Sequence, residues 1–383
     1  MKIRGAPSGG SPRDEDERKM AEKMQDPVNL KKEGGTPPKG PGFKSLLSLQ
    51  IRPELFEPAT DEEKAQHVTM KESVSFMKDA MRRLRKNRIA MISLCVIVLV
   101  ALVAFIVPEF YPYNYKRQDV TAQNLGPFQY SAKEQAKIAK GQSVFPHIMG
   151  TDALGRDYAI RVIYGTRISL VVGIFSALIV VVIGIIYGSI SGYFGGKVDM
   201  IMMRIVDIIY SLPDVLIVIL LSVAIKDIVS NSKNPLIVNL GAGMVSIFIV
   251  FGLLYWVSMA RQVRGQILSI KEQEYVLASK AIGASPGRII RKHMIPNCIS
   301  VIIIIAAMQI PSAIFTESFL SFLGLGVSVP MPSLGSLASD ARTGLRSYPY
   351  QLIFPALSIF LIVLSFNLLG NGLRDAFDPK LRS

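Results

Sequence analysis

The feature that most constrains this chain of 383 residues is a series of long, predominantly apolar runs that follows a polar N-terminal stretch. Soluble domains do not carry repeated apolar runs of about 20 residues, which is the length that a helix needs to cross a bilayer. The sequence therefore predicts an all-α, polytopic membrane protein with six transmembrane helices. The predicted spans are residues 89–107, 168–190, 198–223, 241–260, 299–323 and 353–369.

The polar start of the chain is predicted to be a tail. Residues 1–88 are rich in Gly, Pro and charged residues and are expected not to fold alone. Within them, apolar residues at helical spacing indicate an amphipathic helix between residues 51 and 86. It would lie on the membrane surface or dock on a partner, and the sequence leaves open whether it regulates anything. The spaced apolar residues are Val74, Met77, Ala80, Met81 and Leu84.

Basic residues set the predicted orientation, because Lys and Arg gather on the cytoplasmic side of membrane proteins. A basic cluster directly precedes the first span, and loop 261–298 holds seven Lys/Arg against two acids. Both are predicted in the cytoplasm, as is the C-terminal tail, residues 373–383. Segment 108–167 then faces outside, although it is also fairly basic, and its residues 158–164 are expected to form an interfacial helix. The basic cluster is Arg82, Arg83, Arg85, Lys86 and Arg88.

Between the outer segment and the C-terminal tail, residues 168–372 are predicted to form a membrane core with five spans that includes loop 261–298. The net charge of +14 agrees with a basic cytoplasmic side. It does not indicate a nucleic-acid partner, because no folded basic domain with interleaved aromatic residues is evident. Cys95 and Cys298 lie in or beside apolar runs and lack disulfide or metal-binding spacing.

The sequence does not indicate a membrane enzyme or an ion channel. Only three histidines are present, without H-E-x-x-H or G-x-S-x-G. A repeated filter or charged ring, as an ion channel requires, is also not seen. We predict no catalytic residue, no metal ligand and no cofactor.

Small and polar residues within the spans indicate helix contacts or a solute path. Gly184, Gly188 and Gly192 lie four apart on one helix face, which lets a second backbone approach closely. Glu317 in the fifth span is costly to expose to lipid, and Asn367 in the sixth span is interpreted in the same way. Both are expected to face protein or the path, with a structural hydrogen bond as the preferred role.

The third predicted span carries the most charge at membrane depth. Arg204 and Asp207 are three apart on a helix, a spacing that allows them to pair, although Arg204 is near enough to the inner surface to snorkel there. Pro213, which precedes Asp214, should kink the helix, and irregular backbone at this depth requires a covering of protein or a water-filled path. A structural pair and an element of a solute path remain equal alternatives.

Cytoplasmic segment 261–297 is too long and too patterned for a simple connector. Tyr275, Ser279 and Gly283 recur at helical spacing, so residues 266–282 are predicted to form a helix. Gly283 is placed to end this helix in a left-handed conformation.

A second helix is predicted directly after this corner, with Ser285 as its N-cap and Pro286 in its first turn. Small residues around the corner leave a surface that another protein can approach closely. The alternative is a helical hairpin lying on the membrane, and the residues alone do not decide between the two. The small residues are Ala278, Ser279, Ala281, Gly283 and Ala284.

The stretch EYVLASKAIGASPGRIIRKHMIPN, Glu274 to Asn297, resembles the cytoplasmic loop of the permease subunits of binding-protein-dependent ABC importers. The signature of that loop is Glu-Ala-Ala, three residues and Gly. Here Leu277-Ala278-Ser279 occupies the triplet and Gly283 follows. The glutamate is absent from the triplet and Glu274 lies three residues earlier, a variation that is typical of the peptide-importer branch.

Four further groups of residues resemble the C-type permease of oligopeptide and dipeptide importers, and they follow one another along this chain in the order of that permease. Together they extend the resemblance over most of the chain after Met81. They are Met149-Gly-Thr-Asp-Ala-Leu-Gly-Arg-Asp157 with Tyr164-Gly-Thr-Arg-Ile-Ser-Leu170, Gly192-Tyr-Phe-Gly-Gly196, Arg204 with Asp207 and Pro213, and Glu317-Ser-Phe-Leu-Ser-Phe-Leu-Gly-Leu-Gly326.

The resemblance implies a type I ABC importer permease fold that forms half of a translocation path for oligopeptides or dipeptides. Nickel or another small solute is the alternative. The implied partners are a second permease, two cytoplasmic ATP-binding subunits, an extracellular peptide-binding lipoprotein and the lipid bilayer. This chain itself lacks a Walker A sequence. Its cytoplasmic loop would transmit ATPase closure to the spans, through the implied coupling residues Glu274, Tyr275, Ala278, Ser279, Gly283 and Ala284.

Overall fold

The computed structural model describes residues 76–327 and 331–377, which form helices and loops with no β-strand in those ranges. The all-α class predicted from the apolar runs is confirmed. In chain order the helical elements are α3 (Phe76–Lys86), α4 (Arg88–Phe110), η2 (Val120–Ala122), α5 (Ala132–Ala139), α6 (Tyr158–Phe194), α7 (Gly196–Ser211), α8 (Asp214–Ser230), α9 (Pro235–Leu240), α10 (Ala242–Leu254), α11 (Trp256–Lys271), α12 (Glu274–Ala281), α13 (Pro286–Ile289), the π-helical turn η3 (Ile290–Met294), α14 (Ile295–Phe322), α15 (Leu334–Asp340) and α16 (Tyr350–Phe377).

Five helical stretches of the described chain are long and apolar enough to cross a membrane. A sixth crossing results when α7 and α8, which meet at an angle of 91°, are counted as one broken span. Each of the six overlaps one predicted span. The five continuous stretches are Arg88–Phe110, Tyr158–Phe194, Ala242–Lys271, Pro286–Phe322 and Tyr350–Phe377.

One helix of the outer segment was predicted wrongly. Residues 158–164 do not form a separate interfacial helix but are the first turns of α6, which continues without a break for 37 residues. The Asp157 carboxylate caps this helix by accepting a hydrogen bond from the backbone N–H of Ile160 at 2.9 Å. The capped start lies ten residues before the apolar run, where hydropathy gives no signal of a spanning helix.

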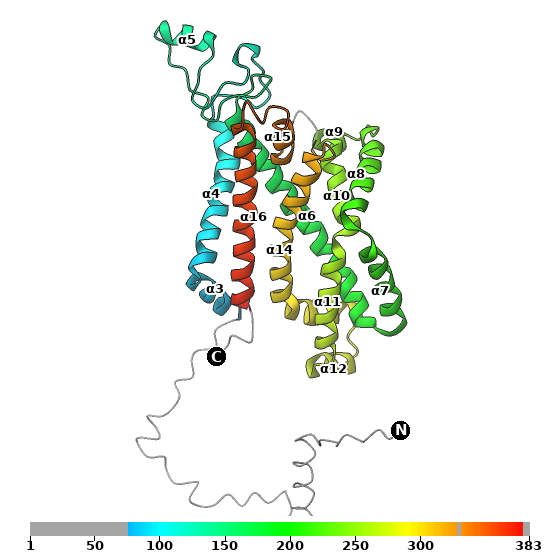
Figure 1. Ribbon diagram of the computed structural model, residues 1–383. Coiled ribbons are helices and arrows are strands. Elements are labelled where there is room, and N and C mark those ends of the chain that lie inside the picture. Colours follow the sequence, from blue (N-terminus) through cyan, green and yellow to red (C-terminus); the bar gives the residue numbers. More distant parts are fainter. Residues whose placement is uncertain (1–75, 328–330, 378–383) are drawn as a thin grey trace, which may run out of the picture. The chain divides into compact units, whose positions relative to one another are not determined.

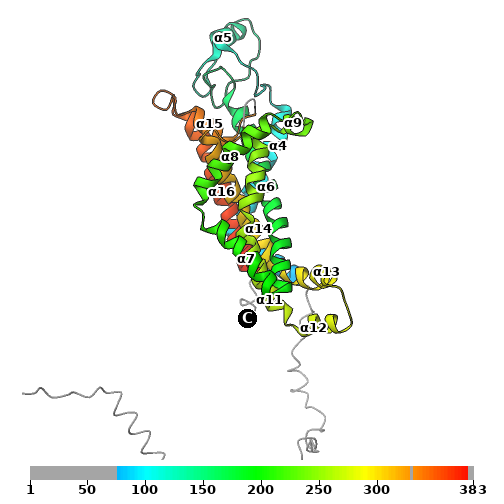
Figure 2. The same ribbon diagram turned by 90° about the vertical axis from the view of Figure 1, so that its right-hand side faces the viewer.

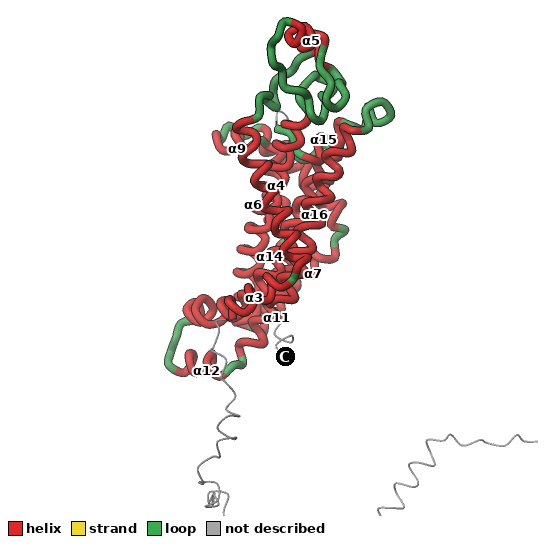
Figure 3. The backbone as a smooth tube through the Cα atoms, turned by 90° about the vertical axis from the view of Figure 1, so that its left-hand side faces the viewer, coloured by secondary structure: helices red, strands yellow, loops and turns green. Residues whose placement is uncertain are grey.

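The long helices α4, α6, α14 and α16 run between two ends of the molecule (Figure 1). The loops gather at these ends, with the polar lobe of residues 111–157 and α5 at one end and α12 at the other (Figure 3). The main core joins α6, α10, α11 and α14 through buried side chains such as Val180, Phe251 and Met259. Other apolar side chains on the long helices are exposed, such as Leu178 of α6 at 56% and Phe360 of α16 at 60%, as a surface that faces lipid requires.

The amphipathic helix predicted before the first span is α3, and its apolar side packs on the same chain. Ala80 and Leu84 are buried against Ala376 and Phe377 at the C-terminal end of α16. The earlier part of the predicted helix, including Val74, and most of the predicted tail lie outside the described residues.

The polar lobe is attached to the membrane helices by hydrogen bonds to the first residues of α16. The Tyr350 hydroxyl donates to the backbone carbonyl of Leu125 at 2.7 Å, and the Gln351 amide donates to that of Thr151 at 3.0 Å. Inside the lobe, Arg161 at the start of α6 contacts the carboxylate of Asp152, and both are buried. The lobe is therefore an ordered extension of the helix bundle.

Candidate functional site

The loop that was predicted to be cytoplasmic forms a short protruding unit at the end opposite the polar lobe (Figure 2). Its helix α12 is held by Val276 and Ser279, which are buried, while Tyr275 and Leu277 are 42% and 51% exposed. Ile282, directly after the helix, is 85% exposed. The loop is thus anchored on one side and presents apolar side chains on the other, where nothing in the described chain covers them.

The single helix predicted over residues 266–282 is wrong, because the structure divides it. α11 ends at Lys271, and Gln273 adopts an extended conformation (φ −71°, ψ 143°) before α12 begins. This break turns α12 away from the line of α11 and buries Val276 in the main core. The periodicity of the sequence continues across the break, which is why the pattern alone did not reveal it.

The corner after α12 has the conformation expected from its glycine. Gly283 has φ +81°, and its N–H donates to the carbonyl of Lys280 at 2.9 Å. A Cβ atom added at this position would meet nothing within 4 Å, so Gly283 lies in open space. Ser285 and Pro286 occupy the N-cap and first-turn positions of α13, although the Ser285 side chain makes no capping hydrogen bond.

The glycine stripe of α6 faces α11, the helix that leads to α12. A Cβ atom at Gly184 would lie 2.4 Å from Met259 Cγ, one at Gly188 2.4 Å from the carbonyl oxygen of Ala260, and one at Gly192 2.9 Å from Ile267 Cβ. These are closer than any real Cβ contact, so only glycine permits the observed approach. Backbone and side-chain atoms of α11 therefore lie directly against the backbone of α6 over two turns.

An ion pair that sequence analysis missed strengthens this helix junction. Arg264 of α11 donates from Nε and Nη2 to the two oxygens of Asp199 on α7, both at 2.5 Å, and Ser191 of α6 also donates to Asp199. Such a bidentate pair is geometrically specific and joins α6, α7 and α11. The only signal in the sequence was one acid and one base near two span ends, which does not specify a partner 65 residues away.

The pair that the spacing of Arg204 and Asp207 allows does not form. Asp207 instead accepts a hydrogen bond from Arg261 of α11 at 2.7 Å, and the guanidinium of Arg261 lies over the ring of Tyr210 at 4.2 Å. Arg204 is exposed. Packing of α7 beside α11 brings a better-placed cation to Asp207 than the neighbour on its own helix.

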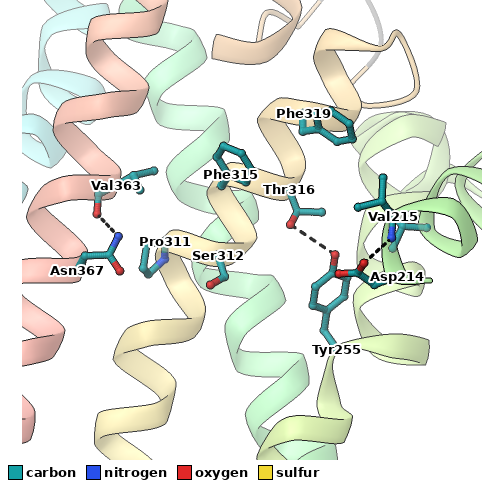
Figure 4. A pocket seen from close by; sticks show the side chains of 11 residues that line it. Asp214, Val215, Tyr255, Pro311, Ser312, Phe315, Thr316, Phe319, Val363 and Asn367 are labelled. Atoms are coloured by element: carbon teal, nitrogen blue, oxygen red, sulfur yellow. Dashed lines mark hydrogen bonds between the residues drawn. The ribbon is translucent and has the colours of Figure 1, made fainter. Parts of the chain in front are cut away.

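Pro213 does more than kink the third span, since it separates α7 from α8. The helix axes differ by 91° at this point, and Leu212 and Pro213 have extended backbone conformations. Beside the break lies a cavity of about 450 Å³ bounded by α8, α14 and α16 (Figure 4). Asn367 lines this cavity, and its amide donates to the carbonyl of Val363 at 2.9 Å.

Glu317 lies on the opposite side of α14 from this cavity and is completely buried. Its carboxylate accepts hydrogen bonds from the hydroxyls of Ser169 on α6 and Ser321, both at 2.7 Å. The Ser321 hydroxyl also accepts from the N–H of Val327 at 3.2 Å. Glu317 thus joins α6, α14 and the segment after α14, and no basic side chain within the described ranges contacts it.

In the described part of the chain, no group of three His, Cys, Asp or Glu side chains is arranged to hold a metal ion.

The sequence matches two families of transport proteins. Residues 184–383 match the binding-protein-dependent transport system inner membrane component family. Residues 75–127 match the N-terminal transmembrane domain of oligopeptide transport permease C.

Individual relatives extend these matches over most of the chain. The oligopeptide transport system permease protein OppC of Bacillus subtilis is 42% identical over 87% of this chain and 99% of its own length. The dipeptide transport system permease protein DppC of the same organism is 46% identical over 81% and 88%. OppC of Escherichia coli is 40% identical over 81% and 93%. This chain therefore belongs to the family of binding-protein-dependent transport system inner membrane components, the permeases with the type I ABC importer fold.

Proposed function

We propose that this chain is one permease subunit of an ATP-driven importer of oligopeptides or dipeptides. The observation that carries the proposal is its similarity, over nearly their whole length, to permeases named for peptide transport. These names favour peptides over nickel or another small solute. The chain would form half of the translocation path, with a second permease forming the other half.

The remaining partners follow from the same proposal. An extracellular peptide-binding lipoprotein would deliver the solute, and two cytoplasmic ATP-binding subunits would supply the energy. The exposed side chains of Tyr275, Leu277 and Ile282 support α12 as the part that docks on an ATP-binding subunit. The basic residues before α4 support a cytoplasmic location for this end of the molecule and for both termini.

Movement of α12 would reach the membrane through α11, which follows from the tight contact of α11 with the glycine stripe of α6. The coupling role is assigned to Glu274, Tyr275, Ala278, Ser279, Gly283 and Ala284. Glu317 and Asn367 would hold α14 and α16 beside the path, since their hydrogen bonds lie on these helices.

A matched pair of glycine substitutions tests the docking surface. Gly283 and Gly141 have φ +81° and +78°, and both face open space within this chain. Arginine at either position therefore carries a similar conformational cost of about 1–3 kcal/mol. Only Gly283 lies in the proposed docking loop, whereas Gly141 lies in the polar lobe.

We expect the Gly283→Arg variant to insert in the membrane but to lose both the ATP-binding subunits on purification and peptide uptake. The Gly141→Arg variant should retain the ATP-binding subunits. The measurement is co-purification from membranes with subunits identified by mass spectrometry, together with uptake of a labelled tripeptide. Retention of ATP-binding subunits and uptake by Gly283→Arg would refute the docking assignment, and a wild-type assembly that imports no peptide would refute the function.

A further inference from the structure

The break between α7 and α8 lies between two adjoining cavities. One is the cavity of Figure 4, and the second, of about 510 Å³, lies between the end of α7, the start of α8 and the α10–α11 junction. Asp214, Val218 and Tyr255 line both. These residues therefore form the wall that the two spaces share.

Asp214 is the only formally charged side chain in the lining of either cavity. Its Oδ1 accepts a hydrogen bond from the backbone N–H of Val215, in the first turn of α8, at 2.8 Å. Across residues 76–327 and 331–377, no cation pairs with it and its Oδ2 accepts no hydrogen bond. Asp214 is exposed to these cavities, and a carboxylate at membrane depth is tolerated where it faces a water-filled cavity or a group of opposite charge.

Aromatic side chains line the same two cavities as this carboxylate. Tyr255 presents its hydroxyl beside Asp214 in Figure 4, and Phe315 and Phe319 of α14 are 61% and 38% exposed along the same cavity. Tyr210 lines the second cavity. A carboxylate combined with aromatic faces is a favourable environment for an ammonium or guanidinium group, which gains both charge pairing and cation–π attraction.

The chain contains an occupied version of this arrangement seven residues earlier. There the Arg261 guanidinium lies between the Asp207 carboxylate, at 2.7 Å, and the Tyr210 ring, at 4.2 Å. At Asp214 the carboxylate and the rings are present, but no side chain of the described chain provides the cation. Of the two carboxylates, only Asp214 lines the cavities, and it lines both of them.

We propose that Asp214 is a binding station for a positively charged group of the solute as it passes the break in the third span. For a peptide, this group is the α-ammonium or a Lys or Arg side chain. The inference rests on the proposed function, and it adds to that function a preference for basic over acidic peptides that belongs to the permease itself.

The test measures the ratio of uptake of tri-lysine to uptake of tri-glutamate by the complete transporter, with the same binding protein in every sample. Because each variant is compared with wild type, the preference of the binding protein cancels and the abundance of the complex does not affect the ratio. The matched control is Asp227→Asn, which removes an exposed carboxylate from the same helix but outside both cavities.

We expect Asp214→Asn to lower the ratio about two- to five-fold, the effect of one partly exposed charge pair. Asp214→Lys should shift the ratio further toward the acidic peptide, and Asp227→Asn should leave it unchanged. An unchanged ratio in both Asp214 variants would overturn the inference. The proposed function would still stand in that case if the wild-type transporter imports peptide. Loss of the second permease from purified Asp214→Asn complexes, with an unchanged ratio, would show instead that a partner subunit supplies the cation.

Discussion

At the scale of single residues, the membrane helices depend on side chains that serve two neighbours at once. Asp157 caps α6 with Oδ1, while its Oδ2 lies 2.7 Å from Nδ1 of His147 in the polar lobe. His147 is buried, stacks on Tyr113 with ring centroids 4.5 Å apart, and places Nε2 3.3 Å from Glu134. Glu134 in turn completes the capping box of α5. The imidazole of His147 therefore contacts the residues that cap the N-termini of α5 and α6.

This arrangement predicts a lobe that is weakened by alkaline conditions. Burial alone would lower the pKa of His147, but the hydrogen bond and charge of Asp157, assisted by Glu134, raise it above its ordinary value of 6.5. A raised folded-state pKa means that protonation stabilises the fold, and this contribution is complete below the unfolded-state pKa. It is lost as the pH rises through the folded-state pKa.

The expected outcome is faster proteolysis of the lobe in lipid nanodiscs as the pH increases from about 5.5 to about 8.5, the range in which histidine titrates. His147→Gln serves as the control, since it should remove the pH dependence that belongs to the imidazole while any effect of pH on the protease remains. Parallel pH profiles for wild type and His147→Gln would contradict the prediction.

At the scale of elements, the contact between α6 and α11 is a close approach that glycine permits, and α11 leads directly to α12. Gly188 is its centre, because an added Cβ would meet the backbone of Ala260 and Arg264 as well as the side chain of Val263. Backbone atoms cannot move aside as a side-chain tip can. Trp256, the only tryptophan of the sequence, lies in the same junction with its ring centroid 4.4 Å from that of Tyr187.

We expect Gly188→Ala to destabilise the protein by about 1–3 kcal/mol, since overpacking a tight contact forces the helices apart. Its apparent unfolding temperature in detergent should fall, and the emission of Trp256 should shift to longer wavelength as the junction loosens.

Gly252→Ala on α10 is the matched control for this substitution. Its added Cβ would lie 3.3 Å from a side-chain carbon of Ile179, which can move. It should be neutral, or stabilising by about 0.5–1 kcal/mol through helix propensity. Equal unfolding temperatures and spectra for the two variants would rule out a special role for the glycine stripe.

At the scale of the whole described chain, polar groups are sorted to two ends. The lobe of residues 111–157 is at one end, and α3, α12 and the end of α16 are at the other (Figure 1). The latter end holds the basic cluster before α4 and the basic loop 261–298. With exposed apolar side chains on the helices between, this sorting supports a multi-pass membrane protein, and the basic end favours the cytoplasm.

Cysteine labelling tests that orientation, because the chain has only two cysteines to replace with serine, Cys95 and Cys298. In this background we expect Gln142→Cys, exposed in the lobe, to react with a membrane-impermeant maleimide in intact protoplasts. Ser285→Cys, exposed between α12 and α13, should react only after the membrane is permeabilised. The opposite labelling pattern would invert the topology and place this loop outside.

The sequence by itself determined the helical class, the number of apolar crossings and the left-handed corner at Gly283, because segment length, hydropathy and glycine chemistry act locally along the chain. The family resemblance was also a local signal, carried by short motifs in order.

Only the tertiary structure decided which charges meet and where space remains. Asp207 pairs with Arg261 across 54 positions instead of with Arg204, and α12 turns away from α11 although the helical pattern continues. The 91° break at Pro213, with the cavities on either side of Asp214, depends in the same way on how α8, α14 and the α10–α11 junction dock. Contacts between helices distant in sequence are selected by shape and by the cost of an unpaired charge in lipid, and neither quantity can be evaluated before the helices are packed.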